Sequence, residues 1–402
     1  MWSASRALLL VQLGSMLVPL FVLPYLAHVL PVQEFAAVAF AQSAYQICVV
    51  IVDFGFPTWG THAIASDLAN ETGIRALYKS VTACRLVLAA ASMLALLAFG
   101  LLSGTEYRQE LLFIWPAVLA QAFQPLWFLQ GVERVERYAH ILVVLRVTFV
   151  AGVLLAVHNP GDGFWSPLLT SITAIIGAAA GTWLARGAGA RVGVPSLESA
   201  LLAFKGGAAF FASRAAVATY TLGGTFYLGL VGTPVQTASY AAAEQLYRGA
   251  LSLVSPLPQA LYPQVSRTRE MRVVALWGIG ATAATAVGAL IFHYVGAQLL
   301  LHVFGEKLAR AFDVLTVFSF AALFAVPSMF AGFPLHACIG NLRWANISLY
   351  FGGVCQTALL VGLYFTGNTS ATLVALGVVA AEATVLLIRM KSAVSYFGWL
   401  RR

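Results

Sequence analysis

The amino-acid sequence predicts an all-α, polytopic membrane protein with twelve transmembrane helices in two six-helix lobes. Of its 402 residues, 60% are hydrophobic and only 9% are charged. The mean hydropathy is +0.85, and apolar runs of about 20 residues recur along the whole chain. Because an ordinary soluble domain carries about a quarter charged residues, that class is excluded. The links between the runs are short, so we expect no extramembrane domain that could carry chemistry.

The apolar runs define the expected spans. The first run follows Arg6 and resembles a signal peptide, but it is long enough to cross a bilayer and no small-x-small cleavage site is evident before it ends. We therefore interpret it as the first span. The twelve expected spans are 7–30, 36–59, 80–103, 111–131, 139–157, 166–186, 206–231, 236–262, 273–295, 313–337, 344–366 and 370–390.

The distribution of Lys and Arg predicts the orientation. Sixteen lie in the N-terminus, in the links after even-numbered spans or in the C-terminal tail, whereas the other links hold Arg108, Lys307 and Arg310. By the positive-inside rule, both termini are expected in the cytoplasm. The sixteen are Arg6, Arg75, Lys79, Arg134, Arg137, Arg186, Arg191, Lys205, Arg267, Arg269, Arg272, Arg343, Arg389, Lys391, Arg401 and Arg402.

A weak internal repeat indicates how the lobes are related. A shift of 203 residues places Pro31-Val32-Gln33 on Pro234-Val235-Gln236, and Gln42 on Gln245. Both tripeptides fall in the link between the first and second span of a six-span half. This is the pattern of parallel repeats related by an axis along the membrane normal, with a cavity between them. The expected lobes are residues 1–190 and residues 191–402.

The stretch Pro234–Ser266 contains an acid and a base at membrane depth. Glu244 and Arg248 lie four residues apart, on one helical face. Ionisable groups at this depth persist mainly where they face water or a partner. The pair therefore indicates either the lining of a transport pathway or a self-neutralising lock between helices. Three prolines predict a bend in the cytoplasmic half of this helix: Pro256, Pro258 and Pro263.

Four arginines lie inside or at the margin of expected spans: Arg85, Arg146, Arg214 and Arg248. If they face a common interior, they attract an anionic ligand, and guanidinium groups match phosphate oxygens in a bidentate way. We therefore predict that they bind substrate. For Arg85 a second interpretation stays open, because a side chain near the span end can extend to the interface.

Three acids lie within spans: Asp53, Glu244 and Glu382. They are candidates for coupling or for charge pairing. Asp53 precedes Phe54-Gly55-Phe56-Pro57, so it can pair with an arginine, carry a proton or bond backbone groups freed around Gly55. Glu382 is a candidate proton site in the last span.

Missing motifs narrow the class of protein. There is no G-x-x-x-x-G-K-[ST] loop, so we expect no ATP hydrolysis by this chain. No H-E-x-x-H, nucleophile elbow or metal-ligand spacing occurs, so no metal or cofactor is expected. The net charge is +8, but the sequence has no run of basic residues with interleaved aromatics, so nucleic acid is not an expected partner. Uphill movement would depend on a gradient of H+ or Na+, on the membrane potential or on consumption of the product.

Short stretches along nearly the whole chain carry a family resemblance. They are Leu23–Ala27, Glu34-Phe35, Asp53–Phe56, Pro125–Glu133, Ala238–Leu246, Pro256–Ser266 and Phe304–Glu306. On these stretches the chain resembles the Wzx-type flippases of lipid-linked oligosaccharides. These are the polysaccharide-biosynthesis (O-antigen repeat-unit) transporters of the MOP (multidrug/oligosaccharidyl-lipid/polysaccharide) exporter superfamily.

The resemblance implies a function and a location. The expected activity is translocation of an undecaprenyl-pyrophosphate-linked oligosaccharide repeat unit to the outer leaflet of the bacterial inner membrane by alternating access. The arginines would bind the pyrophosphate and sugars in a V-shaped cationic cavity, while the lipid tail remains in the bilayer through a lateral opening. Expected partners besides the lipid bilayer are a polysaccharide polymerase and a chain-length regulator.

Two alternatives stay open. An ion-coupled drug or metabolite exporter of the same superfamily usually needs acidic residues that hold cations, whereas this chain has four intramembrane arginines and only three intramembrane acids. A membrane polymerase or ligase generally carries a large extracytoplasmic loop. The longest expected outer link in this chain is only 296–312.

Overall fold

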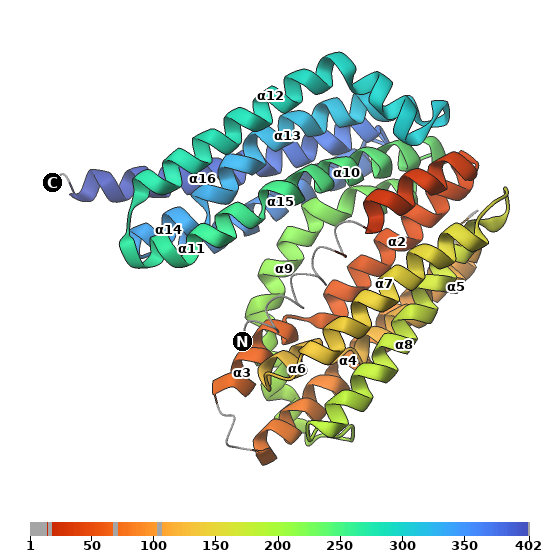
Figure 1. Cartoon of the computed structure of the whole chain (residues 1–402), viewed down its shortest axis with the longest axis vertical. Coiled ribbons are helices and arrows are strands. Elements are labelled where there is room, and N and C mark those ends of the chain that lie inside the picture. The colour runs from red at the N-terminus through yellow and green to blue at the C-terminus, as the bar shows by residue number, and fades with distance from the viewer. Residues whose placement is uncertain (1–13, 15–17, 67–70, 103–106, 401–402) are drawn as a thin grey trace. The chain divides into compact units, whose positions relative to one another are not determined.

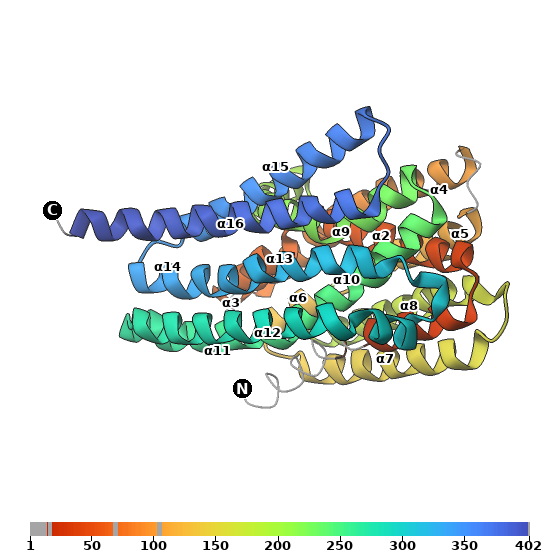
Figure 2. The same ribbon diagram turned by 90° about the horizontal axis from the view of Figure 1, so that it is seen from above.

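The computed structural model describes residues 14, 18–66, 71–102 and 107–400. Over these ranges the secondary structure is helical, without strands, which confirms the all-α prediction. The chain forms two compact units, unit 1 (Met1–Ala215) and unit 2 (Ala216–Arg402). The helices of both units are labelled in Figure 1, and Figure 2 gives a second view. Apart from Gly14, the part of the expected first span before Val18 lies outside the described residues, as does Arg6.

Unit 1 contains six helical segments followed by the first part of α9. The second segment is divided into α2 and α3, and the fourth into α5 and α6. The bounds are Val18–Val29 for the first helix, Val32–Asp53 (α2), Phe56–Ser66 (α3), Glu71–Leu102 (α4), Arg108–Ala122 (α5), Leu126–Gly131 (α6), Glu136–Ala156 (α7), Asp162–Phe164 (η1) and Trp165–Gly187 (α8).

Unit 2 repeats this order. It begins with the second part of α9, and its second and fourth segments are again divided, into α10 with α11 and α13 with α14. The bounds are Leu197–Val231 (α9), Pro234–Val254 (α10), Pro256–Thr268 (α11), Met271–Phe304 (α12), Glu306–Leu308 (η2), Ala311–Ala331 (α13), Phe333–Ile339 (α14), Arg343–Phe365 (α15) and Ala371–Leu400 (α16).

The number of helices agrees with the twelve predicted. Among the described residues, ten helical segments are long and apolar enough to cross a membrane. The other two are the helix Val18–Val29, whose described part is short, and the α10–α11 segment, whose interior face carries buried polar side chains such as Thr237 and Glu244. Large apolar side chains of α12, including Leu276 and Ile279, are about 70% exposed, as expected for a surface that contacts lipid.

The breaks in the long helices follow local sequence signals. Between α2 and α3, Phe54 and Gly55 have φ angles of +40° and +76°, which interrupts the expected span 36–59. Gly55 has no substitute here, because a Cβ atom at this position would meet the carbonyl oxygen of Gly207. Between α10 and α11 the chain passes through Ser255 into Pro256, so the bend predicted from the prolines is confirmed as a helix boundary.

The repeat detected in the sequence agrees with the order of helices. When shifted by 203 residues, the starts of α2, α4 and α5 fall at 235, 274 and 311. The corresponding helices α10, α12 and α13 start at 234, 271 and 311. In each unit the short helices that follow the breaks pack against one another, α3 on α6 and α11 on α14. The two units therefore share one architecture.

The division between the units lies inside α9, between Ala215 and Ala216, whereas the sequence placed it in the link at 190/191. The reason is that the two parts of α9 have different neighbours. In the first part, Gly206 lies against the indole of Trp59. In the second part, the hydroxyl of Tyr227 donates to the carbonyl of Asn368 at 3.4 Å. Because α9 is one continuous helix shared by both units, the residue composition does not change at their boundary, and the sequence gives no signal of it.

Candidate functional site

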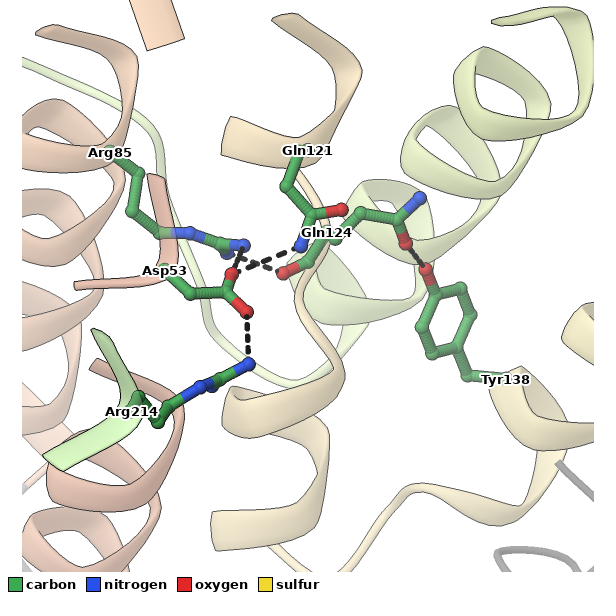
Figure 3. Close-up of polar contacts among 6 residues, drawn as sticks. All are labelled: Asp53, Arg85, Gln121, Gln124, Tyr138 and Arg214. Atoms are coloured by element: carbon green, nitrogen blue, oxygen red, sulfur yellow. Dashed lines mark hydrogen bonds and ion pairs between the residues drawn. The ribbon is translucent and has the colours of Figure 1, made fainter. Parts of the chain in front are cut away.

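Asp53 is the centre of a buried polar cluster in unit 1 (Figure 3). It is the last residue of α2, and Phe54, which follows it, has the left-handed conformation that ends the helix. One oxygen accepts a hydrogen bond from Arg85 at 2.7 Å and another from the amide of Gln121 at 3.0 Å. The other oxygen lies 3.4 Å from a guanidinium nitrogen of Arg214. One carboxylate is thus shared by two arginines from different helices.

Arg85 is enclosed. Its side chain is only 2% exposed, and besides its bond to Asp53 it donates to the carbonyl oxygen of Gln124 at 2.7 Å. Gln124 lies in the break between α5 and α6, and its own side chain accepts from the hydroxyl of Tyr138. Burial of a charge is tolerated when it is paired and hydrogen-bonded. Arg85 therefore holds the α5–α6 break against α4, and it does not extend to the interface.

Arg214 is the accessible member of the same cluster. It lies near the end of the part of α9 that belongs to unit 1, and its side chain is 40% exposed. Its contact with Asp53 is longer than that of Arg85, and the negative charge of Asp53 is already balanced by Arg85. The cluster of Asp53, Arg85 and Arg214 thus has a net positive charge, and its exposed part is the guanidinium of Arg214.

Unit 2 holds the second predicted pair. On α10, Arg248 lies 3.3 Å from a carboxylate oxygen of Glu244, one turn earlier. The same oxygen accepts a hydrogen bond from the hydroxyl of Thr225 on α9 at 2.6 Å. Glu244 is buried, whereas the side chain of Arg248 is 33% exposed. As in unit 1, a buried acid holds a partly exposed arginine.

Arg146 lies on α7 and Glu382 on α16. Arg146 is half-buried on α7, and a Cβ atom at Gly14 would lie 3.0 Å from its Cδ atom. Over the described ranges of the chain, neither Arg146 nor Glu382 forms an ion pair. Glu382 is half-buried on α16, two turns before Arg389. The structure thus brings together Asp53, Arg85 and Arg214, and separately Glu244 and Arg248.

Arg389 is a buried residue that the sequence placed in the C-terminal tail. Arg389 lies at the end of the expected span 370–390, but α16 continues ten residues further, to Leu400, so Arg389 is inside this helix and buried rather than in a tail. Its guanidinium donates to the Ser348 hydroxyl at 2.9 Å, to the Ser328 carbonyl at 2.7 Å and to the Ala345 carbonyl at 3.2 Å. These neutral oxygens compensate for the loss of water around the charge.

Sequence reasoning also missed the uncharged partners and one acid. Gln121, Gln124 and Thr225 complete the clusters, but a single amide or hydroxyl in an apolar run gives no signal of its partner. Glu110 is 6% exposed in the first turn of α5, although the sequence places it in a link. Across the described residues, no three His, Cys, Asp or Glu side chains gather as a metal site would require.

The fold places the chain in a class of membrane proteins. It matches a multidrug-resistance MATE family transporter of the MOP superfamily in an inward-facing conformation, with a TM-score of 0.67, 11% identity, and coverage of 97% of this chain and 95% of that chain. It also matches the lipid II flippase MurJ in an inward closed conformation, with a TM-score of 0.67, 14% identity, and coverage of 96% and 87%. The chain therefore has the MOP superfamily fold, as the sequence predicted.

Sequence comparison identifies the family. Residues 2–269 match the profile of the family described as "Polysaccharide biosynthesis protein", and the chain belongs to this family. It is 24% identical over 328 residues to a protein of Escherichia coli (strain K12) that is named for O-antigen transport, covering 78% of this chain and 77% of the relative. A protein of Shigella dysenteriae with the same name is 27% identical over 267 residues, covering 65% and 66%.

Proposed function

We propose that this protein is a flippase. It moves an undecaprenyl-pyrophosphate-linked oligosaccharide repeat unit from the cytoplasmic to the outer leaflet of the bacterial inner membrane by alternating access. Membership of the polysaccharide biosynthesis family and relatives named for O-antigen transport support a transporter and argue against an enzyme. The lipid II flippase MurJ, with the same fold, is named for a lipid-linked substrate. A cytoplasmic location of both termini stays a prediction from the Lys and Arg distribution.

One observation carries the assignment of the binding residues. Arg214 and Arg248 are each held by a buried carboxylate, yet 40% and 33% of their side-chain surfaces stay exposed. A guanidinium that is held in place but not enclosed can donate to a phosphate oxygen while it keeps its carboxylate partner, because it has five donors in a fixed fork. Both residues therefore bind the pyrophosphate or the sugars of the lipid-linked unit, in the charged cavity expected from the sequence.

The other charged residues have different roles in this proposal. Asp53 and Glu244 orient the two binding arginines, and Arg85 fixes Asp53 from its buried position. Arg146 is a further substrate ligand whose side chain is only half-buried. Glu382 and a gradient of H+ or Na+ are the candidates for coupling, and a polymerase and a chain-length regulator are the expected partners.

Replacement of the binding arginines tests the proposal. Arg214→Ala or Arg248→Ala should abolish transfer of purified lipid-linked repeat unit across reconstituted vesicles, while the protein remains folded. Lysine at either position should restore activity only in part, because it retains the charge but not the fork. Lys391→Ala, an exposed cation outside both clusters, is the matched control. Unchanged transfer by both alanine variants would contradict the proposed role of these residues.

A further inference from the structure

An apolar groove lies in unit 1 between α4 and the first part of α9, with a volume of 390 Å³. This size falls within the range of small-ligand pockets. Its walls come from α4, from the link between α8 and α9, and from α9 itself. The lining includes Ala83, Val87, Leu88, Val194, Ala200 and Phe204. The lining is almost entirely apolar, so a ligand would place hydrocarbon here.

The α4 wall of the groove continues into basic residues. Arg75, Lys79, Ala83 and Val87 follow one another at intervals of four, so they lie along one face of the helix. At 1.5 Å per residue, Lys79 and Val87 are about 12 Å apart along the axis. The cationic end is the one that the Lys and Arg distribution assigns to the cytoplasm. This face thus combines a charged end near the expected membrane surface with an apolar part deeper in the bilayer.

The link between α8 and α9 adds to the basic end. Lys79 lies against Gly193: a Cβ atom on this glycine would be 3.5 Å from the Cε atom of Lys79. Arg75 lies beside Gly189, where a Cβ atom would be 3.8 Å from the Nε atom of Arg75. Arg191, between these two glycines, is exposed. Two acids are also present. Glu71 pairs with Arg75 at 2.8 Å, and Glu198 lies in the first turn of α9. Because Glu71 offsets Arg75, the cations available at this end are Lys79 and Arg191, and Glu198 reduces their net charge to one.

The deep wall of the groove is connected to the Asp53 cluster. The ring of Phe204 stacks on the ring of Phe54 with centroids 4.1 Å apart, and Phe211 stacks on Phe54 at 4.4 Å. Phe54 follows Asp53 directly and has a φ angle of +40°, which is unfavourable for a residue other than glycine. A hydrocarbon chain in the groove would support Phe204, and through it the turn that orients Asp53.

We propose that this groove binds an anionic phospholipid of the surrounding leaflet, with its phosphate at Lys79 and Arg191 and one acyl chain along Ala83, Val87 and Phe204. The charge is complementary, and the order of charged and apolar residues matches the orientation of a phospholipid in that leaflet. This lipid is distinct from the transported molecule, so the site does not depend on the proposed function. It makes the Asp53 cluster sensitive to the composition of the membrane.

Native mass spectrometry of the full-length protein in detergent tests the site. After delipidation, the protein is titrated with phosphatidylglycerol and with phosphatidylcholine that carry the same acyl chains. We expect tighter binding of phosphatidylglycerol. Each of Lys79→Gln and Arg191→Gln should weaken it roughly fivefold, without affecting phosphatidylcholine. Val87→Trp should fill the groove and reduce binding of both lipids.

Matched controls separate the groove from general contact with lipid. Arg343→Gln removes an exposed cation in unit 2, and Val354→Trp adds a ring at an exposed position of α15; both should leave lipid binding unchanged. Thermal unfolding confirms that each variant is folded. Equal retention of phosphatidylglycerol by the Lys79→Gln, Arg191→Gln double variant would overturn the proposal. Displacement of bound phosphatidylglycerol by purified polyprenyl phosphate at equal concentration would also overturn it, because the groove would then belong to the substrate.

Discussion

The acids that hold Arg214 and Arg248 are anchored in different ways. Asp53 joins side chains from α4, α5 and α9, and one of its partners is completely enclosed. Glu244 pairs within its own helix, one turn away from Arg248, and its contact to a second helix is a single hydroxyl. The same local arrangement, an acid beside an accessible arginine, is therefore part of the helix packing in unit 1 and largely independent of it in unit 2.

The largest effect is expected for Asp53→Asn. The substitution leaves Arg85 buried without a counter-charge, which costs about 3–5 kcal/mol when a buried pair is broken. Thermal unfolding of the purified full-length protein measures the loss. Glu71→Gln is the control, because it removes one charge from the more exposed Glu71–Arg75 pair, where less than about 1 kcal/mol is expected. Equal destabilisation by the two variants would show that the cluster does not support the fold.

A smaller loss is expected for Arg389→Met. Methionine occupies a similar volume but leaves the Ser328 and Ala345 carbonyls and the Ser348 hydroxyl without their donor. An unsatisfied buried group costs about 1–3 kcal/mol. Part of this free energy is recovered because methionine also removes a buried charge, and no acid forms an ion pair with Arg389 among the described residues. Thermal unfolding again gives the comparison. A loss as large as that of Asp53→Asn would mean that Arg389 compensates a buried negative charge.

The smallest effect is expected for Glu244→Gln. Glutamine retains an oxygen that accepts from Thr225, and the Arg248 side chain is 33% exposed and can bond water, so the loss of stability should be about 1 kcal/mol, the value of one hydrogen bond. Transport should change more than stability, because Arg248 loses the group that orients it. Thr225→Val, which removes the hydroxyl but retains the ion pair, is the matched variant. A destabilisation close to that of Asp53→Asn would remove the contrast between the units.

Much of the fold follows from local signals in the sequence. The spans follow from apolar runs, and the break between α10 and α11 follows from the prolines after Ser255. The break after Asp53 was not predicted, because the apolar run 36–59 continues through it. The repeat was visible in a few identities because the two halves retain the same spacing of helices. The boundary inside α9 was not visible, because it depends on which neighbours Gly206 and Tyr227 contact.

The site was only partly accessible to sequence reasoning. The pairing of Glu244 with Arg248 follows from their spacing, and an arginine partner for Asp53 was one of three interpretations. Hydropathy gives the depth of a residue but not the direction of its side chain. For this reason extension of Arg85 to the interface stayed open as a second interpretation although Arg85 is enclosed, and Arg389 was assigned to the tail although it is buried.

The arginines at the helix breaks also affect how the units can deform. Arg85 donates to a carbonyl in the α5–α6 break, and Arg389 donates to the Ser328 carbonyl, whose helical partner is lost at the α13–α14 break. Each break is thereby hydrogen-bonded to a neighbouring helix by a buried charged side chain, and such bonds are stronger in a low-dielectric interior than in water. In a transport cycle, each helix break would therefore move as a rigid body with the helix that supplies its arginine.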